Sequence, residues 1–279
     1  MMQIEKVINN NVVSARDETN QEIVVMGKGI GFKAKTGHVI QKDKIEKTFY
    51  MDNQRSVDKF KELLTNMPLE HIQVSSDIVE YAKRVLNKRL NQNIYITLTD
   101  HINFAVERFN QGMMFQNPLL WEVKNLYREE YLIGEYAVAL IRKELGVNLP
   151  VDEVASVALH IVNAEYDTVM GEAINITKCI PEILQIVKDY YNIELDEESI
   201  HYERFITHLK FLTQRIVKKE LLDNKDKEFK DMIEKLYPRE YRCAKVIGDY
   251  IREHFSHNIT EEELTYLTVH IRRVILADQ

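Results

Sequence analysis

The first 55 residues carry short apolar runs that are separated by turn-forming residues. The runs are rich in Val, Ile and Phe, whereas the segments between them are rich in Asn, Asp, Gly and Lys. This alternation is typical of short β-strands joined by tight turns. It predicts a small antiparallel meander with strands at residues 4–8, 12–15, 23–26, 30–33 and 45–51.

From Val57 onward the apolar positions follow a helical period instead. Phe60, Leu63, Leu64 and Met67 stand at i, i+3, i+4 and i+7, a spacing that places them on one face of a helix. The residues that mark further helix starts are Ser75-Ser76, Thr97 with Thr99, Pro150 with Asp152-Glu153, and Thr260 with Glu261–Glu263. Nearly everything after residue 57 is therefore predicted to be helix.

An internal repeat divides this helical part into two copies. At an offset of 110 residues the matches are Leu126-Tyr127 with Leu236-Tyr237, Glu130-Tyr131 with Glu240-Tyr241, Ile141-Arg142 with Ile251-Arg252, Glu153 with Glu263, and His160-Ile161 with His270-Ile271. At an offset of 107 residues the motif H-x-x-F-x-x-x-R occurs twice, as His101, Phe104 and Arg108 and as His208, Phe211 and Arg215. Self-similarity at a fixed offset indicates a duplicated helical domain.

The pattern and the repeat together predict a multidomain α and β protein. A small N-terminal antiparallel β-sheet domain is expected at residues 1–56, and two homologous all-α helical bundles at residues 57–170 and 171–279. The linker between the bundles is expected at residues 167–172, which contain Gly171. Because a sheet domain of this size buries only a small core, a second copy of the chain is the simplest partner for it, and a homodimer is expected.

Charge is distributed unevenly along the chain. The net charge is −7, but residues 1–55 hold nine Lys/Arg and seven Asp/Glu, a balance of +2, and the remainder has a balance of −9. Such asymmetry either indicates that the parts have different partners or is a fluctuation without functional meaning, and charge alone does not distinguish the two. The two cysteines, Cys179 and Cys243, have neither metal-type nor redox spacing and are expected to be core residues. No targeting segment and no run of about 20 apolar residues occurs, which predicts a cytoplasmic protein without membrane insertion.

Four of the nine histidines fall at equivalent places in the two copies: His101 and His160 in the first, His208 and His270 in the second. A single such histidine is most simply a half-buried side chain that is satisfied by a hydrogen bond. Its duplication raises a second interpretation, because imidazole is neutral and nucleophilic near pH 7 and can accept a phosphoryl group. A metal site has little support without an i, i+4 pair or a cysteine ligand, so no metal and no cofactor are expected. The other five histidines are expected to be surface residues.

The N-terminal turns offer a candidate nucleic-acid surface. Tight turns alone require residues such as Asn9–Asn11 and Gly27-Lys28-Gly29, and this explains most clusters of that kind. In a functional interpretation, the glycines allow the backbone to approach phosphates and the Asn amides read base edges. Phe32 would then stack on an unpaired base, and Lys6 and Lys28 would contact phosphates.

Three stretches of this N-terminal part, IEKVINNNVV (4–13), VVMGKGIGF (24–32) and KIEKTF (44–49), resemble the RNA-binding domain of the BglG/SacY family of transcriptional antiterminators. LTDHINFAVER (98–108) and VALHIVNAE (157–165) resemble the first regulatory domain of that family, and RFITHLKF (204–211) and YLTVHI (266–271) resemble the second. The similarity spans the whole chain and keeps the domain order. It is greatest toward the branch of the family that serves β-glucoside use.

The resemblance implies a mechanism. A dimer of the β domain binds a hairpin in the leader mRNA of a sugar operon, and the bound hairpin excludes an overlapping terminator. The sugar-specific permease of the phosphotransferase system (enzyme II) phosphorylates the first helical domain and inactivates the protein, whereas the phosphocarrier HPr phosphorylates the second and activates it. By this resemblance the RNA-contacting residues are Lys6, Asn11, Gly27, Lys28, Gly29 and Phe32, and the phosphoacceptors are His101, His160, His208 and His270. Lys28 stands where relatives can carry Arg, and Lys lacks the planar bidentate contact of Arg.

Two other classes of protein are weighed against this one. A histidine-dependent phosphotransferase is disfavoured because the chain has no Gly-rich phosphate loop, Walker lysine or nucleophile elbow, so the protein is not expected to be an enzyme. A DNA-binding activator with duplicated regulatory domains would begin with a helix-turn-helix. The N-terminal pattern here is strand-like instead.

Overall fold

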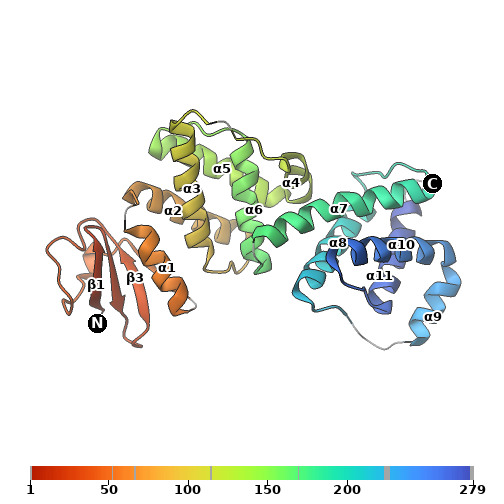
Figure 1. Cartoon of the computed structure of the whole chain (residues 1–279), viewed down its shortest axis with the longest axis horizontal. Helices are drawn as coiled ribbons and strands as arrows, with labels where there is room; N and C mark the ends of the chain where they lie inside the picture. The colour runs from red at the N-terminus through yellow and green to blue at the C-terminus, as the bar shows by residue number, and fades with distance from the viewer. Residues whose placement is uncertain are drawn as a thin grey trace. The chain divides into compact units, whose positions relative to one another are not determined.

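The computed structural model describes residues 2–51, 53–65, 67–113, 115–168, 170–222 and 227–276. Two compact units divide the chain, Met1–Asp167 and Thr168–Gln279, and each is described by itself. The order of elements is visible in Figure 1, where a sheet precedes a long succession of helices. This arrangement confirms the predicted fold class, a small antiparallel sheet followed by all-α regions.

The N-terminal sheet is a four-stranded antiparallel meander with strand order β1-β2-β3-β4. Its strands are β1 (Gln3–Asn9), β2 (Val12–Arg16), β3 (Glu22–Met26) and β4 (Lys47–Phe49). The strand predicted at residues 30–33 is wrong, because these residues form successive turns. Their amides are satisfied locally, as when Phe32 N donates to the Gly29 carbonyl oxygen at 3.1 Å. Positive φ angles at Gly29 (69°) and Lys33 (56°) are incompatible with a strand.

Each face of the sheet is covered by a different part of the first unit. Ile4, Val13 and Val25 point into a small core that is closed by the segment between β3 and β4, including Ile30 and Ile40. On the other face the side chains belong to the large core of the helical part. The sheet residues on that face are Val12, Val24, Met26 and Phe49, and they pack with Val57, Phe60 and Leu64 of helix α1 (Gln54–Leu64). A homodimer therefore stays a prediction whose basis is the family resemblance and not an uncovered apolar face.

The remaining helices of the first unit are α2 (Leu69–Leu86), α3 (Ile94–Asn110), α4 (Leu120–Leu126), α5 (Arg128–Leu145) and α6 (Asp152–Tyr166). Two of the predicted helix starts are wrong. Ser75 and Ser76 lie buried within α2, where the Ser75 hydroxyl donates to the His71 carbonyl oxygen at 2.7 Å. Thr97 and Thr99 lie within α3. A serine or threonine hydroxyl can bond back to the preceding turn, so its presence does not by itself mark a helix end.

The second unit repeats the helix order of the first, as expected from a duplication. Its described helices are α7 (Met170–Tyr191), α8 (Ile200–Lys218), α9 (Lys227–Leu236), α10 (Pro238–Phe255) and α11 (Glu261–Leu276). The predicted start at Thr260 is confirmed, because its hydroxyl accepts a bond from Glu263 N at 3.2 Å. Gly171 and Glu172 lie in the first turn of α7, so the linker predicted at residues 167–172 is too long. Val169, inside that segment, lies outside the described residues.

The two cysteines lie where the sequence predicts them, but not all of the remaining histidines do. Cys179 and Cys243 are free and buried in the second unit, as expected for core residues. His71 and His201 are not simple surface residues, because both are half-buried. His71 Nδ1 lies 2.8 Å from Asn103 Oδ1. Across the described part of the chain, no helix combines the length and the hydropathy that crossing a bilayer requires.

The packing of α1 on the sheet generates a testable prediction. Phe60 is fully buried and meets Phe49 edge-on, with ring centroids 5.0 Å apart. Phe60→Ala should lower the free energy of unfolding of the first unit by about 3–5 kcal/mol, because it leaves a cavity between α1 and the sheet. Scanning calorimetry of the full chain measures this loss. Phe109→Ala, at a 39% exposed position on α3, serves as the matched control and should change the transition little.

Candidate functional site

Each helical copy brings its two equivalent histidines into contact. In the first copy His101 on α3 and His160 on α6 have ring centroids 4.7 Å apart, with an interplanar angle of 40°. In the second copy His208 on α8 and His270 on α11 are 4.3 Å apart and stack at 19°. The four predicted phosphoacceptors thus form two pairs, one in each unit, although the members of a pair are distant in sequence.

The rings of His160, His208 and His270 are held neutral by their surroundings. Burial lowers the pKa of His160 well below its ordinary value, and repulsion from a positive charge on His101 lowers it further. Burial also lowers the pKa of His208 to about 3, and His270 and Arg215 add to this effect. The pKa of His270 is lowered by burial and by the charge of Arg273. At neutral pH these imidazoles therefore carry a free lone pair on one ring nitrogen.

Some of the ring nitrogens are buried without a hydrogen-bond partner among the described residues. They are His160 Nδ1, His208 Nε2 and His101 Nε2. His101 Nε2 lies 3.0 Å from Glu153 Oε2, but the two atoms are not aligned as a hydrogen bond. Because buried polar atoms are normally satisfied, such atoms are candidates for a function other than packing.

A buried carboxylate anchors the pair in the first copy. Glu153, in the first turn of α6, accepts a hydrogen bond from Arg108 Nη2 of α3 and also lies beside His101. Burial raises the pKa of the Glu153 carboxyl, but His101 and Arg108 outweigh burial and hold this pKa below its usual value. Glu153 therefore stays charged while it ties together the two helices that carry His101 and His160.

The second copy has the same anchor with a different relation to its histidine. Glu263, whose side chain is fully buried in the first turn of α11, accepts from Arg215 Nε and Nη2, both at 2.7 Å. Its Oε1 also accepts from Leu222 N at 3.2 Å. In the described residues no ion pair joins Glu263 to His208, in contrast to Glu153 and His101. The Glu263 carboxylate of the second copy thus accepts hydrogen bonds from Arg215 and from the backbone, and among the described residues it forms no ion pair with His208.

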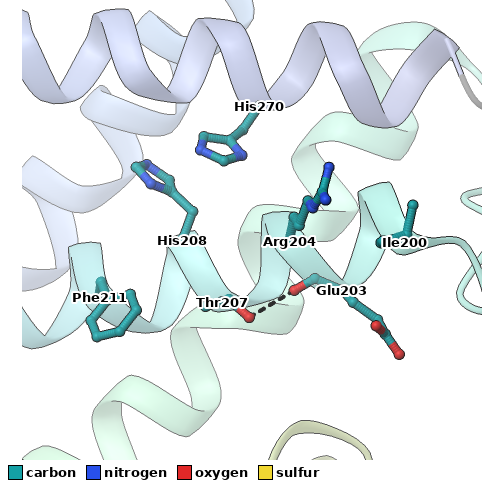
Figure 2. A pocket seen from close by; sticks show the side chains of 7 residues that line it. All are labelled: Ile200, Glu203, Arg204, Thr207, His208, Phe211 and His270. Carbon is teal, nitrogen blue, oxygen red and sulfur yellow. Dashed lines mark hydrogen bonds between the residues drawn. The ribbon is translucent and has the colours of Figure 1, made fainter.

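A pocket of about 500 Å³ opens beside His208 and His270. Figure 2 shows the two imidazole rings next to one another, with Arg204 extending from α8 on the side of α11. The other lining residues are Ile200, Glu203, Thr207 and Phe211. Ile200 and Phe211 are 56% and 53% exposed. The pair is therefore half-buried but approachable from solvent.

This arrangement suits phosphoryl transfer better than metal binding. A neutral imidazole with an unpartnered ring nitrogen beside an open pocket can act as a nucleophile. Within the described ranges no group of three or more His, Cys, Asp or Glu side chains is placed to hold a metal ion.

The structure joins several of the predicted RNA-contacting residues at one end of the sheet. Gly27 N donates to the Asn11 carbonyl oxygen and Gly29 N donates to Asn11 Oδ1, both at 2.9 Å. The Asn11 amide oxygen is thereby occupied, so its Nδ2 group is the part that remains to donate to a ligand. Lys28 and Phe32 belong to the same turns and are exposed, Phe32 to 61%. A basic and aromatic surface of this kind fits unpaired bases and phosphates.

Lys6 lies apart from this group. It is exposed on the edge strand β1, opposite Ser14 of β2. Its positive charge contributes to the lowered pKa of Asp58 on α1, behind the side-chain bonds from Lys61 and Gln54. Lys6 is thus on the side of the sheet that faces α1.

Two residues near these turns have structural roles that the sequence did not predict. Asn9 Oδ1 accepts from Asn11 N at 2.8 Å, and Asn9 Nδ2 donates to the Leu64 carbonyl oxygen of α1 at 2.9 Å. Gly31 is needed because a Cβ there would lie 2.1 Å from the Asn9 carbonyl oxygen. The signals were present in the runs NNN and GKGIGF, as was the repeated Glu153 and Glu263. Their partners could not be read from the sequence.

Comparisons with known proteins agree with this geometry. Residues 2–57 match the family described as CAT RNA binding domain, and residues 76–164 and 181–274 match the PRD domain. The chain is 47% identical to the transcription antiterminator LicT of Bacillus subtilis, over 98% of this chain and 99% of that protein. It is 42% identical to the β-glucoside operon antiterminator of Dickeya chrysanthemi, over 98% of this chain and 96% of that protein. The crystal structure of GlcT CAT-PRDI superposes with a TM-score of 0.53 at 37% identity, covering 59% of this chain and 98% of that one.

The buried histidine of the second copy generates a prediction about pH. The pKa of His208 is about 3 in the folded chain and about 6.5 in an unfolded one. Above about pH 6.5 both forms are neutral, so His208 has no effect on stability there. Below it the unfolded chain binds a proton that the folded chain cannot, and the free energy of unfolding falls by about 1.4 kcal/mol per pH unit.

Urea unfolding of the full chain between pH 7 and pH 5 measures this slope. His208→Gln should make the decline less steep, whereas His254→Gln, at an exposed position on α10, should leave it as in the wild type. Equal slopes for wild type and His208→Gln would contradict a neutral, desolvated ring.

Proposed function

We propose a function from the premise that this chain belongs to the family of transcription antiterminators in which a CAT RNA-binding domain precedes PRD domains. It is an RNA-binding antiterminator of a sugar-utilisation operon, and histidine phosphorylation by the sugar phosphotransferase system controls it. The observation that carries the regulatory half is the pair of facing, half-buried histidines in each copy. The chain receives phosphoryl groups from donor proteins and is not itself an enzyme.

The RNA-binding half of the proposal concerns residues 1–56. A dimer of this domain binds a hairpin in the leader transcript, and the hairpin excludes an overlapping terminator so that polymerase reads through. The support lies in the turns that gather Asn11, Gly27 and Gly29 next to exposed Lys28 and Phe32. A β-glucoside operon is the proposed target, because one relative at 42% identity is named for it. The protein then works where leader transcripts are made, in the cytoplasm.

The regulatory half concerns residues 57–170 and 171–279, which act as two separate switches. The sugar-specific permease, enzyme II, phosphorylates His101 or His160 when its sugar is absent, and this inactivates the protein. HPr phosphorylates His208 or His270 when preferred sugars are scarce, and this activates it. Each phosphoryl group adds a charge of about −2 beside a half-buried ring. Such a charge changes the balance between two arrangements of the helices around it.

The first helical domain packs directly against the sheet that carries the turns proposed to bind RNA. The sheet shares its larger core with α1, and Asn9 bonds both the β1–β2 turn and the end of α1. A movement of α1 is therefore transmitted to the residues that we propose to contact RNA, without any loose segment between them.

RNA binding by the full chain tests the first half of the proposal. Lys6→Ala should weaken binding to a leader hairpin and reduce the dependence of log K on log salt by about one phosphate contact. Asn11→Ala should weaken binding with little change in that slope, because an amide contact releases no counterion. Fluorescence anisotropy at several salt concentrations measures both. Lys59→Ala, an exposed lysine on α1, is the matched control, and Lys6→Ala binding RNA like Lys59→Ala would contradict the assignment.

Reporter transcription in cells tests the second half. Replacing His101 or His160 with Ala should make read-through independent of the inducing sugar, since the inactivating charge can no longer be added. Replacing His208 or His270 with Ala should reduce the activation that depends on HPr. His254→Ala provides the control for an exposed histidine. If all four replacements responded like the wild type, the histidine pairs would be packing residues only.

A further inference from the structure

The two histidine pairs sit in different electrostatic surroundings, although their scaffolds are homologous. In the second copy, Arg204 stands four residues before His208 on α8 and lines the same pocket. Arg273 stands three residues after His270 on α11, and its charge helps to lower the pKa of His270. The i, i+4 and i, i+3 spacings put each arginine on the same helix face as its histidine. Figure 2 shows Arg204 beside the two rings.

Both arginines are available to a ligand. They are exposed, and neither has an ion-pair partner in the described part of the chain. The arginines that hold structure together are different ones, since Arg215 is paired with Glu263 and Arg272 with Glu240. Arg204 and Arg273 thus contribute positive charge at the histidine pair without satisfying any acidic group of the protein.

The first copy lacks both charges. At the offsets of the repeat, Thr97 stands in place of Arg204 and Asn163 in place of Arg273. Asp100 stands where the second copy has Thr207, and it is exposed one residue before His101. The Glu153 carboxylate also lies 3.0 Å from His101 Nε2. A doubly negative group on His101 would therefore lie beside the Glu153 carboxylate. On His208 or His270 it would lie beside Arg204, because Figure 2 shows the Glu203 carboxylate of the same pocket pointing away from the rings.

We propose that Arg204 and Arg273 form a phosphoryl clamp that holds a phosphoryl group on His208 or His270, and that the first copy has no such clamp. The inference rests on the proposed function, because it takes these histidines to be phosphoacceptors. In the transfer a neutral ring nitrogen attacks phosphorus, the N–P bond of the donor breaks, and a new N–P bond forms. The clamp neutralises the transferred group during and after this step, as guanidinium groups do for phosphate elsewhere.

The clamp also explains why phosphorylation of the two copies has opposite consequences. In the second copy the added charge binds two side chains of the same unit, one from α8 and one from α11, and draws these helices together. In the first copy the same charge is repelled by Glu153, so it disturbs the packing around α3 and α6. Attraction stabilises one arrangement and repulsion destabilises the other.

Chemical phosphorylation of the full chain tests the clamp without a donor protein. Potassium phosphoramidate supplies the group, its P–N bond breaks with ammonia as the leaving group, and mass spectrometry of peptides locates the phosphohistidines. The double variant Arg204→Gln with Arg273→Gln should reduce phosphohistidine at His208 and His270 by at least about tenfold, as expected for the loss of one charge-assisted hydrogen bond or more. Arg204→Lys should retain a larger part, because it keeps the charge. Arg242→Gln, an exposed arginine on α10, is the matched control, and His101 with His160 provide an internal one.

The reverse substitution gives a gain of signal. Thr97→Arg should increase phosphohistidine at His101 or His160, with the second copy unchanged. Wild-type phosphorylation of His208 and His270 in the double variant would overturn the clamp and leave the proposed function intact. A wild-type chain whose histidines accept phosphate neither from phosphoramidate nor from HPr would overturn the proposed function itself, and the clamp with it.

Discussion

The buried pair of a glutamate and an arginine is the interaction on which the regulatory part of the structure depends. Glu153 with Arg108, and Glu263 with Arg215, each join the first turn of one helix to the neighbouring helix. A buried carboxylate requires its partner, because an unpaired charge in the interior costs several kcal/mol. In both copies each histidine stands seven residues, two helical turns, from the charged residue of its own helix. Fixing the charged pair therefore also fixes the histidines against one another.

Burial near this anchor also determines the chemistry of the histidines. A ring that is removed from water keeps its lone pair at neutral pH, because the charged form is disfavoured. The same low polarity strengthens the electrostatic interactions of every charge that is introduced there. A phosphoryl group on such a ring has a large effect on its surroundings, whereas on an exposed histidine it would be screened by water and salt. Homologous scaffolds can then respond differently through a few side chains at the rim of the pocket.

Much of this fold could be predicted from the sequence, and the failures have physical causes. The sheet, the helical repeat and the cap at Thr260 rest on local patterns, which the structure bears out. Ser75 and Ser76 were wrong as caps because a hydroxyl can bond to its own helix instead. The run at residues 30–33 is apolar like a strand, but Ile30 serves the core from a turn.

The candidate site was likewise predictable only in part. The four histidines were visible because duplication marks them, but their pairing depends on helix packing, which no local pattern contains. The bidentate bond from Arg215 to Glu263 was likewise hidden, although both residues recur in the repeat. Long-range polar contacts of this kind are set by the tertiary structure and not by spacing along the chain.

The two apolar faces of the sheet are covered by different segments of the first unit. One face is closed by the chain between β3 and β4, which also carries the glycine turns. The other is closed by α1, and separating them would expose Val24, Phe49 and Phe60 together. At about 25 cal/mol per Å² of apolar surface, such exposure is too costly to occur as a routine motion. The sheet and α1 therefore move as one body, and a change in the helical domain reaches the turns that we propose to contact RNA as a shift of their position and not as a change of their shape.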